Sequence, residues 1–182
     1  RNCWAEHFEC GAWIANYVGR GSNNLLIEHC RFRNNYADGV NCSHSSNGHM
    51  VRYCSFRNNG DDDMASWSVV VKCQDVTYAY CTAENNWRAS SLGFFGGKNL
   101  TAHHIAIFDA LESGLRINSD FSGPGFDTNG TINIYDITIN HCGCTGGTRG
   151  NSGDFWGNTQ GAVNIGSTNY YAIHNVMLNN IT

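Results

Sequence analysis

Four of the few acidic side chains lie in two aligned stretches of the sequence. Only 15 of the 182 residues are Asp or Glu, yet Asp61, Asp62 and Asp63 are consecutive. Asp38 precedes Asp62 at an offset of 24, and the stretches NNYADGVN and NNGDDDMA align around these two acids. Carboxyl groups held close together repel one another and raise each other's pKa. General acid–base hydrolysis needs such a group, because one carboxyl must donate a proton while another activates water.

Two other interpretations of these acids stay open. An acidic turn can simply be solvated, and Ca²⁺ prefers several carboxylate and carbonyl oxygens, so a structural calcium ion is possible. The aligned Asp38 and the aromatic Trp67 that follows the acids favour the catalytic interpretation. The pattern requires no cofactor, and no metal ligand set is predicted. Cys142 and Cys144 have one residue between them and no matching second pair, which is not zinc spacing.

The acids recur because the chain is built from repeats. The segment from Ile27 to Asn41 aligns without gaps on Val51 to Ala65, at an offset of 24. The stretch TYAYCTAENNWRASSL continues the pattern at a further offset of 27, and NCWAEHF precedes it by the same offset. Less regular units follow at 103–117, 132–142 and 174–181, with longer excursions at 118–130 and 143–161 between them. Such units cannot bury an apolar side alone and must stack on their neighbours.

The composition favours strands and turns over helices. The sequence contains 24 Asn and 21 Gly against one Pro, together with many β-branched and aromatic residues. The Leu-x-x-Leu-x-Leu frame of leucine-rich repeats is absent. We therefore expect an all-β protein, a single-domain parallel β-helix over positions 1–182. Its coils should each contain roughly 23 to 27 residues, the period of the repeat. We also expect a fragment of a longer chain, with both ends uncapped, because Arg1 follows no initiator Met.

Two columns of like residues follow from this register. Cys3, Cys30, Cys54 and Cys81 should form an interior stack of thiols, with Ala5, Phe32, Phe56 and Ala83 beside it. Asn34, Asn58 and Asn85 should form a ladder of side-chain amides in a bend. A disulfide among Cys10, Cys42, Cys73, Cys142 and Cys144 stays open as an alternative for the remaining cysteines.

The charge and the hydropathy pattern argue against two classes of partner. The net charge is −4, which gives no general case for nucleic-acid binding. The sequence has no long apolar run of the kind that spans a bilayer, so no membrane-spanning segment is predicted. We expect neither nucleic acid nor membrane as a partner.

The acidic stretches resemble those of β-helical glycosidases. Polygalacturonases carry an Asp in one coil and an Asp-Asp pair in the next. The likeness is closer to glycoside hydrolase family 87, the bacterial α-1,3-glucanases and mycodextranases, whose Gly-Asp-Asp-x-x-Ala-x-Trp-Ser frame is complete from Gly60 to Ser68. The resemblance implies a right-handed β-helix, a secreted enzyme, an inverting mechanism and a catalytic triad of Asp38, Asp61 and Asp62. Asp63 lies outside that triad.

The resemblance also implies a neutral polysaccharide substrate, an α-glucan. The chain lacks the Gly-His-Gly and Arg-Ile-Lys patterns of polygalacturonases, and Gly114-Leu-Arg116-Ile-Asn118 echoes the second only in part. We therefore expect a monomeric enzyme with additional domains that cleaves α-1,3-glucosidic bonds. The alternative is a β-helix that binds polysaccharide, either without catalysis or as a calcium-dependent binding protein or lyase.

Roles within the site follow by analogy with polygalacturonases. Asp61 would be the general acid, with Asp38 and Asp62 holding the water, and an exchange of Asp61 and Asp62 stays open. Inversion calls for an acid-to-base gap of roughly 6.5 to 9.5 Å, which we expect between Asp61 and the other two acids. Aromatic and polar residues near the acids, or on the later loop, are candidates for substrate binding: Trp67, Trp87, Arg88, Glu112, Asp154 and Trp156.

Overall fold

A computed structural model describes residues 1–14, 21–119, 123–143, 161–167 and 171–182, and all elements in these ranges are β-strands. One sheet has ten strands: β1 (Trp4–Glu6), β3 (Leu26–Glu28), β4 (Arg31–Arg33), β6 (Met50–Arg52), β7 (Ser55–Arg57), β9 (Thr77–Ala79), β10 (Thr82–Glu84), β12 (Leu100–Phe108), β14 (Ile132–Asn140) and β16 (Val176–Ile181). The other has six: β2 (Ala12–Ile14), β5 (Val40–Ser43), β8 (Met64–Trp67), β11 (Ser90–Phe95), β13 (Ser113–Asn118) and β15 (Val163–Gly166). Within the described part of the chain, no helix has the length and apolarity to cross a membrane.

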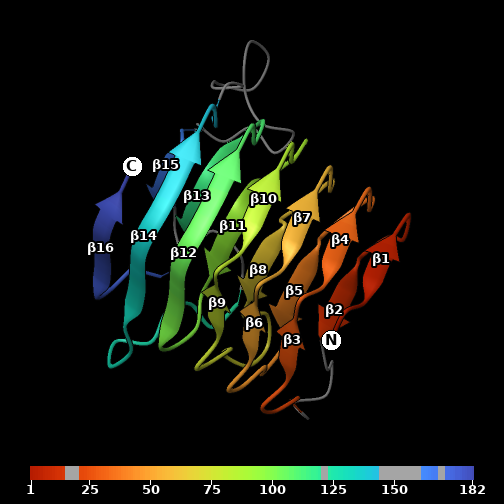
Figure 1. Cartoon of the computed structure of the whole chain (residues 1–182). Coiled ribbons are helices and arrows are strands. Elements are labelled where there is room, and N and C mark those ends of the chain that lie inside the picture. Colours follow the sequence, from red (N-terminus) through yellow and green to blue (C-terminus); the bar gives the residue numbers. More distant parts are fainter. Residues whose placement is uncertain (15–20, 120–122, 144–160, 168–170) are drawn as a thin grey trace.

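The strands wind into a right-handed parallel β-helix, as predicted. In Figure 1 the chain rises along the ten-stranded sheet, returns along the six-stranded sheet behind it, and moves one strand further with each coil. All strand pairs are parallel. Early coils use two short strands in the large sheet, whereas β12 spans both positions and pairs with β9 and β10.

The register of the early coils confirms the repeat found in the sequence. Arg31 pairs with Trp4 on one side, a step of 27, and with Ser55 on the other, a step of 24. Ser55 in turn pairs with Thr82, again a step of 27. The acids therefore lie where the alignment placed them, in neighbouring coils.

Some coils are longer than the sequence repeat predicts. Met64 pairs with Leu92, a step of 28. Leu100 pairs with Ile132, a step of 32, and Leu115 with Val163, a step of 48. The strand register resumes after each of the excursions between the later units.

The interior follows the predicted cysteine column with one correction. Cys30, Cys54 and Cys81 are buried, but Cys3 is exposed. Cys3 lies in the first described coil, which has a neighbouring described coil on one side. Next to the cysteines, the Phe32 and Phe56 rings stack with centroids 5.3 Å apart. Ala83 is buried in the same column and Ala5 is partly buried. The described cysteines form no disulfide: Cys3, Cys10, Cys30, Cys42, Cys54, Cys73, Cys81 and Cys142 are free thiols, and Cys144 lies outside the described residues.

The predicted asparagine column forms a corner of the coil. Asn34, Asn58 and Asn85 all have positive φ, between 54° and 55°. Asparagine tolerates this left-handed conformation better than most residues. The Asn58 side-chain amide donates to Asn34 Oδ1 at 2.9 Å, which confirms that step of the ladder. The corner turns the chain from the large sheet toward the six-stranded one, just before the acids.

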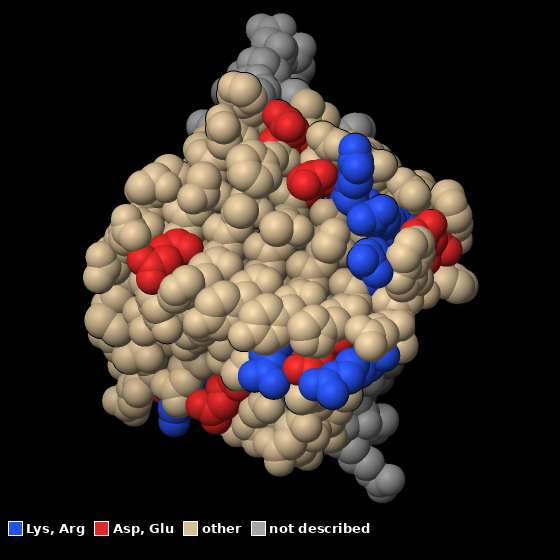
Figure 2. All heavy atoms as spheres, in the orientation of Figure 1, with Lys and Arg blue, Asp and Glu red and all other residues tan. Residues whose placement is uncertain are grey.

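The outer face of the ten-stranded sheet carries a row of charged side chains. Figure 2 shows a broad uncharged area in the middle of this view, with Lys and Arg at the right and bottom and with Asp and Glu at the top, left, right and bottom. In the register of the sheet, Glu6, Arg33, Arg57 and Glu84 follow one another across β1, β4, β7 and β10. Arg57 Nε lies 3.7 Å from Glu84 Oε2. The acids of interest are therefore not part of this charged row.

Candidate active site

A second, buried asparagine column holds the loop that carries the acids. Asn59 is fully buried, and its Oδ1 accepts a hydrogen bond from the side chain of Asn35 at 2.9 Å. Asn59 Nδ2 donates to Asp63 Oδ1 at 2.7 Å. From the following coil, the Asn86 side chain donates to the carbonyl oxygen of Asp61. The side-chain amides of Asn35, Asn59 and Asn86, from three successive coils, thus hold the segment from Asn59 to Asp63 by hydrogen bonds to its neighbours before and after it.

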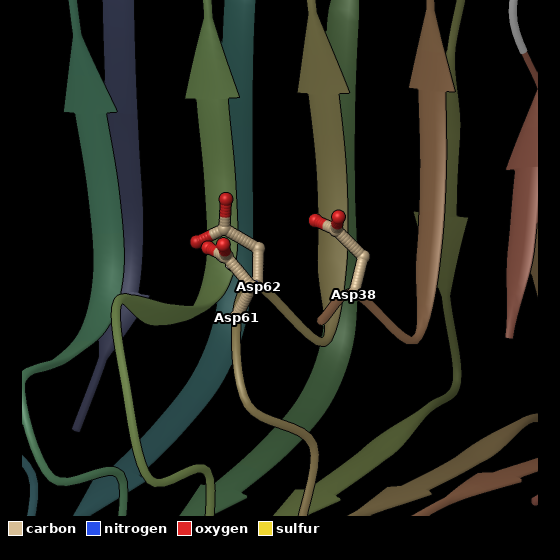
Figure 3. Close-up of side chains that lie close together, drawn as sticks. All are labelled: Asp38, Asp61 and Asp62. Atoms are coloured by element: carbon tan, nitrogen blue, oxygen red, sulfur yellow. Dashed lines mark hydrogen bonds between the residues drawn. The ribbon is translucent and has the colours of Figure 1, made fainter. Parts of the chain in front are cut away.

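The three predicted catalytic acids come together. The Gly39 amide donates to the carbonyl of Asp62 at 3.0 Å, so the backbones that carry Asp38 and Asp62 are neighbours. Asp38, Asp61 and Asp62 each offer a carboxylate oxygen within 4.8 Å of the other two. Figure 3 shows the three carboxyl groups on the same side of adjacent coils. The wide gap expected between Asp61 and the other two acids is wrong, because Asp61 turns toward the Asp62 carboxyl instead of away from it.

Asp38 is a buried acid with weak hydrogen-bond donors. Its side chain accepts from Asn41 Nδ2 at 3.3 Å and from the Cys10 thiol, whose Sγ lies 3.8 Å from Oδ2. Burial, followed by the charge of Asp61, raises the pKa of Asp38 to about 7. Burial also raises the pKa of Cys10 to about 12, so this thiol stays protonated and donates. Asp38 can therefore carry or release a proton near neutral pH.

Asp62 lies deepest in the charge cluster. Its Oδ1 accepts hydrogen bonds from the Ser90 amide, at 3.0 Å, and from the Ser90 hydroxyl. Burial raises its pKa well above the usual range, and the charges of Asp61 and Asp38 raise it further. Gly93 in the next coil leaves the room that this carboxyl occupies, since a Cβ there would lie 3.2 Å from Asp62 Cγ. These surroundings thus favour the protonated form of Asp62.

Asp61 is the most exposed of the three acids and has a cationic partner. Its Oδ2 lies 3.0 Å from Arg88 Nη2, with side chains 28% and 16% exposed respectively. Burial raises the pKa of Asp61, but the charges of Arg88 and Arg116 act in the opposite direction. The pKa of Asp61 is still raised overall, and the two arginines oppose part of the effect of burial.

The structure places Trp87 and Arg88 at the acids, as predicted. The Arg88 guanidinium lies 5.6 Å from the ring centroids of both Tyr36 and Trp87. Trp87 packs on the backbone of Gly60, where a Cβ would overlap the indole ring. These contacts fix Arg88 against Asp61. Contact of Trp87 or Arg88 with a substrate stays a prediction.

The other predicted binding residues have different placements. Trp67 lies on the outer face of β8, near Trp13 and His44. Glu112 is buried, and the Ser113 amide that follows it donates to the Ala89 carbonyl, which places Glu112 in the column of Asp61. Asp154 and Trp156 lie outside the described residues.

Four site residues were not among the candidates of the sequence analysis, although Arg116 belongs to the stretch that echoes the Arg-Ile-Lys pattern in part. Cys10 and Ser90 occupy the column of Asp38 and Asp62 in the coils on either side, so the register alone could have found them. Asn41 and Arg116 point outward on β5 and β13. The charge of Arg116 lowers the pKa of Asp61 and of Asp62, although it lies far from them in sequence. Only the coiling of the chain brings Arg116 to the acids.

A cation is the other ligand that the cluster could take. Three carboxyl oxygens within 4.8 Å of one another are suitable donors for a hard ion such as Ca²⁺. Two observations oppose it: Arg88 pairs with Asp61, and Arg116 adds a second positive charge nearby. The raised pKa values of Asp38 and Asp62 also mean that these oxygens bind protons readily. The site fits proton transfer better than metal binding.

The fold and the site together define a β-helical protein with a carboxyl cluster of the kind used in glycoside hydrolysis. The family model described as "Alpha-1,3-glucanase catalytic domain D2" matches residues 1–182, and the chain belongs to that family. This finding confirms the resemblance to glycoside hydrolase family 87. No curated relative matches the chain in sequence.

Three solved structures are similar over 98% of the chain. The Agl-KA catalytic domain is 39% identical, with a TM-score of 0.86. An Asp-to-Ala variant of a family 87 α-1,3-glucanase catalytic domain in complex with tetrasaccharides is 25% identical, with a TM-score of 0.79. The catalytic unit of the thermostable α-1,3-glucanase of Streptomyces thermodiastaticus is 24% identical, with a TM-score of 0.77. The match covers 31% of the first of these chains and 32% of the other two, so the present chain spans about a third of their length.

Proposed function

We propose that the full-length protein hydrolyses α-1,3-glucosidic bonds in α-glucan at the Asp38, Asp61 and Asp62 triad. The observation that carries this proposal is the meeting of three carboxyl groups from two coils within 4.8 Å, in a chain of the α-1,3-glucanase D2 family. The pKa of Asp38 is raised to about 7, and that of Asp62 is raised well above its usual range. Such a cluster can supply a proton donor and a carboxylate at the same time, which glycoside hydrolysis needs.

The roles within the triad follow from its charges. Arg88 favours the ionised form of Asp61, whereas burial and two neighbouring acids favour the protonated form of Asp62. We therefore assign the proton donor to Asp62 and the activation of water to Asp61 together with Asp38. This exchanges Asp61 and Asp62 relative to the assignment by analogy with polygalacturonases. Proton transfer of this kind contributes about 10² to 10⁴ in rate for each group.

Inversion of the anomeric centre is the outcome that the family resemblance implies. Water held by two carboxylates would attack the face of the sugar opposite the departing oxygen, so an α-linked substrate would release a β-anomer. One oxygen of each carboxyl lies within 4.8 Å of the others, which is less than the roughly 6.5 to 9.5 Å gap typical of inverting enzymes. Proton NMR of the first product therefore decides the stereochemistry, and an initial α-anomer would replace inversion by retention.

A secreted enzyme of several domains is part of the proposal. Polymeric glucan cannot enter a cell intact, so its hydrolysis requires the enzyme outside. Solved relatives about three times as long as this chain support additional domains in the full-length protein.

The deciding experiment is incubation of the full-length protein with α-1,3-glucan, α-1,3/1,4-glucan and α-1,4-glucan. We expect new reducing ends from glucans that contain α-1,3 bonds and none from the α-1,4-polymer. Asp38→Asn should abolish the release, whereas Asp75→Asn, an exposed acid on another corner, should leave it unchanged.

The same assay separates the alternatives. An unsaturated, ultraviolet-absorbing product would indicate a lyase, and binding of glucan without new ends would indicate a binding module. Loss of activity on calcium removal would favour a calcium-dependent protein, whereas we expect activity to persist in the presence of a chelator.

A further inference from the structure

A pair of tryptophans lies beside the acids on the outer face of the six-stranded sheet. The ring centroids of Trp13, on β2, and Trp67, on β8, are 5.9 Å apart, and the rings are nearly perpendicular at 86°. Strand β5 runs between β2 and β8, so the two indole groups meet across it. The outward positions of β5 that pair with these tryptophans hold the small side chains of Asn41 and Ser43. Small residues between them let the two rings approach.

This pair is close to the catalytic acids through Asn41. Trp13 is the register partner of Asn41 in the neighbouring strand, about 4.8 Å away. Asn41 Nδ2 in turn lies 3.3 Å from Asp38 Oδ1. Trp13 therefore lies one strand from a side chain that touches the triad, a distance comparable with the length of one sugar ring.

The ring of Trp13 is held in place and still open to a ligand. Its side chain is 42% exposed. An edge-to-face pair uses at most one face of each ring, so Trp13 keeps a face for another partner. Trp67 is packed between Trp13 and His44, whose ring centroid lies 6.2 Å away. Aromatic faces carry negative charge density and attract the polarised C–H groups on one side of a pyranose ring. A fixed platform also loses little freedom on binding.

We propose that Trp13, supported by Trp67, forms a glucose-binding subsite one coil to the N-terminal side of the triad. This inference rests on the proposed α-glucan hydrolysis and names where one end of the chain lies. A substrate long enough to reach Trp13 gains the stacking contact, whereas a shorter one does not. The subsite therefore makes longer α-1,3-oligosaccharides the better substrates.

The test compares Trp13→Ala with the unaltered full-length protein on a series of α-1,3-linked oligosaccharides of increasing length. We expect Trp13→Ala to raise KM for the long substrates about tenfold, which corresponds to about 1.4 kcal/mol, with little change in kcat. The shortest cleaved substrate should be unaffected, and Trp13→Tyr should restore most of the preference. Trp4→Ala is the matched control, because Trp4 is 61% exposed on β1 in the other sheet.

A binding measurement keeps this inference separate from the proposed reaction. Calorimetric titration of the same oligosaccharides into Asp38→Asn protein, with and without Trp13→Ala, measures the affinity that the subsite contributes in the absence of turnover. Trp13-dependent binding, together with an unaltered full-length protein that cleaves none of the glucans, would support the subsite and overturn the hydrolase. Cleavage or binding with a length dependence that Trp13→Ala leaves unchanged would overturn the subsite, and so would a failure to bind any of the oligosaccharides.

Discussion

Arg88 Nη2 lies 3.0 Å from Asp61 Oδ2, and this ion pair places a positive charge against one of three acids that act on each other's pKa. Replacing Arg88 by Ala should raise the pKa of Asp61, because the guanidinium favours the carboxylate. Activity that needs an ionised Asp61 would then be lost at a higher pH on the acidic side of the pH–rate profile. We expect an upward shift of that limb by about one unit and up to about a tenfold loss of kcat/KM at about pH 5.

The control for this prediction is Arg57→Ala, which removes an exposed ion pair with Glu84 on the other sheet. Its pH–rate profile should match that of the unaltered protein. An acidic limb that does not move in Arg88→Ala would show that Asp61 is not the carboxylate of the mechanism.

Substrates with different leaving groups distinguish the proton donor, Asp62, from the two carboxylates that activate water, Asp38 and Asp61. Asp38→Asn, Asp61→Asn and Asp62→Asn should each reduce turnover of α-1,3-glucan by about 10² to 10⁴. An aryl α-glucoside with a good leaving group needs no proton donor, so Asp62→Asn should keep most of its activity on that substrate. Asp38→Asn and Asp61→Asn should lose activity on both substrates. Selective retention by Asp61→Asn instead would restore the assignment by analogy.

The Cys10 thiol should influence the pKa of Asp38, to which it donates a hydrogen bond. The thiol donates to Asp38 and favours its carboxylate, so Cys10→Ala should raise the pKa of Asp38 further. We expect the acidic limb of the pH–rate profile to move upward by a fraction of a pH unit, since a thiol is a weak donor. Cys10→Ser, which keeps a donor, should move it less. The exposed Cys3→Ala is the control, and an unchanged profile in Cys10→Ala would contradict the coupling.

Asp63 should affect stability more than turnover. It is fully buried, and burial raises its pKa to about 7. The folded chain therefore holds this proton more tightly than the unfolded chain does, so the stabilising contribution is present at low pH and is lost as pH rises from about 4 to about 7. Each pKa unit corresponds to about 1.4 kcal/mol, which gives a contribution of about 2 to 4 kcal/mol.

Asp63→Asn should remove this part of the pH dependence and reduce turnover only mildly. Urea unfolding at pH 4.5 and pH 7.5 measures it: the difference in unfolding free energy between the two pH values should shrink in the variant. The part due to Asp38 remains, because its pKa is also raised. Asp75→Asn is the exposed control, and an equal pH dependence in Asp63→Asn and the unaltered protein would show that Asp63 does not titrate in this range.

The repeat predicts most of the early fold because its recurring residues suit particular positions of a coil. Asn34 and Asn58 take left-handed backbone, and Phe32 and Phe56 stack inside, so their recurrence reports the register directly. Later coils lose this signal, since excursions of variable length separate them. The exposure of Cys3 also escapes the repeat, because burial depends on neighbours on both sides.

The meeting of the acids and the nearness of Arg88 were predictable from the repeat, whereas the directions of the side chains and the contribution of distant segments were not. Asp38 and Asp62 share a column, so their meeting follows from the register. The direction of the Asp61 side chain depends on Arg88, which no spacing rule reveals. Arg116 comes near through the coiling of distant segments, and Trp13 through the order of strands in one sheet.

The column of Asp38 and Asp62 continues in both directions, with Cys10 before it and Ser90 and Ser113 after it. Successive coils thus present equivalent side-chain positions at intervals of about 4.8 Å. In such a scaffold, single substitutions can move a reactive group from one coil to the next while the backbone stays the same. Natural or laboratory evolution can therefore shift the reactive group along the axis of the β-helix, in steps of one coil, relative to the bound polymer.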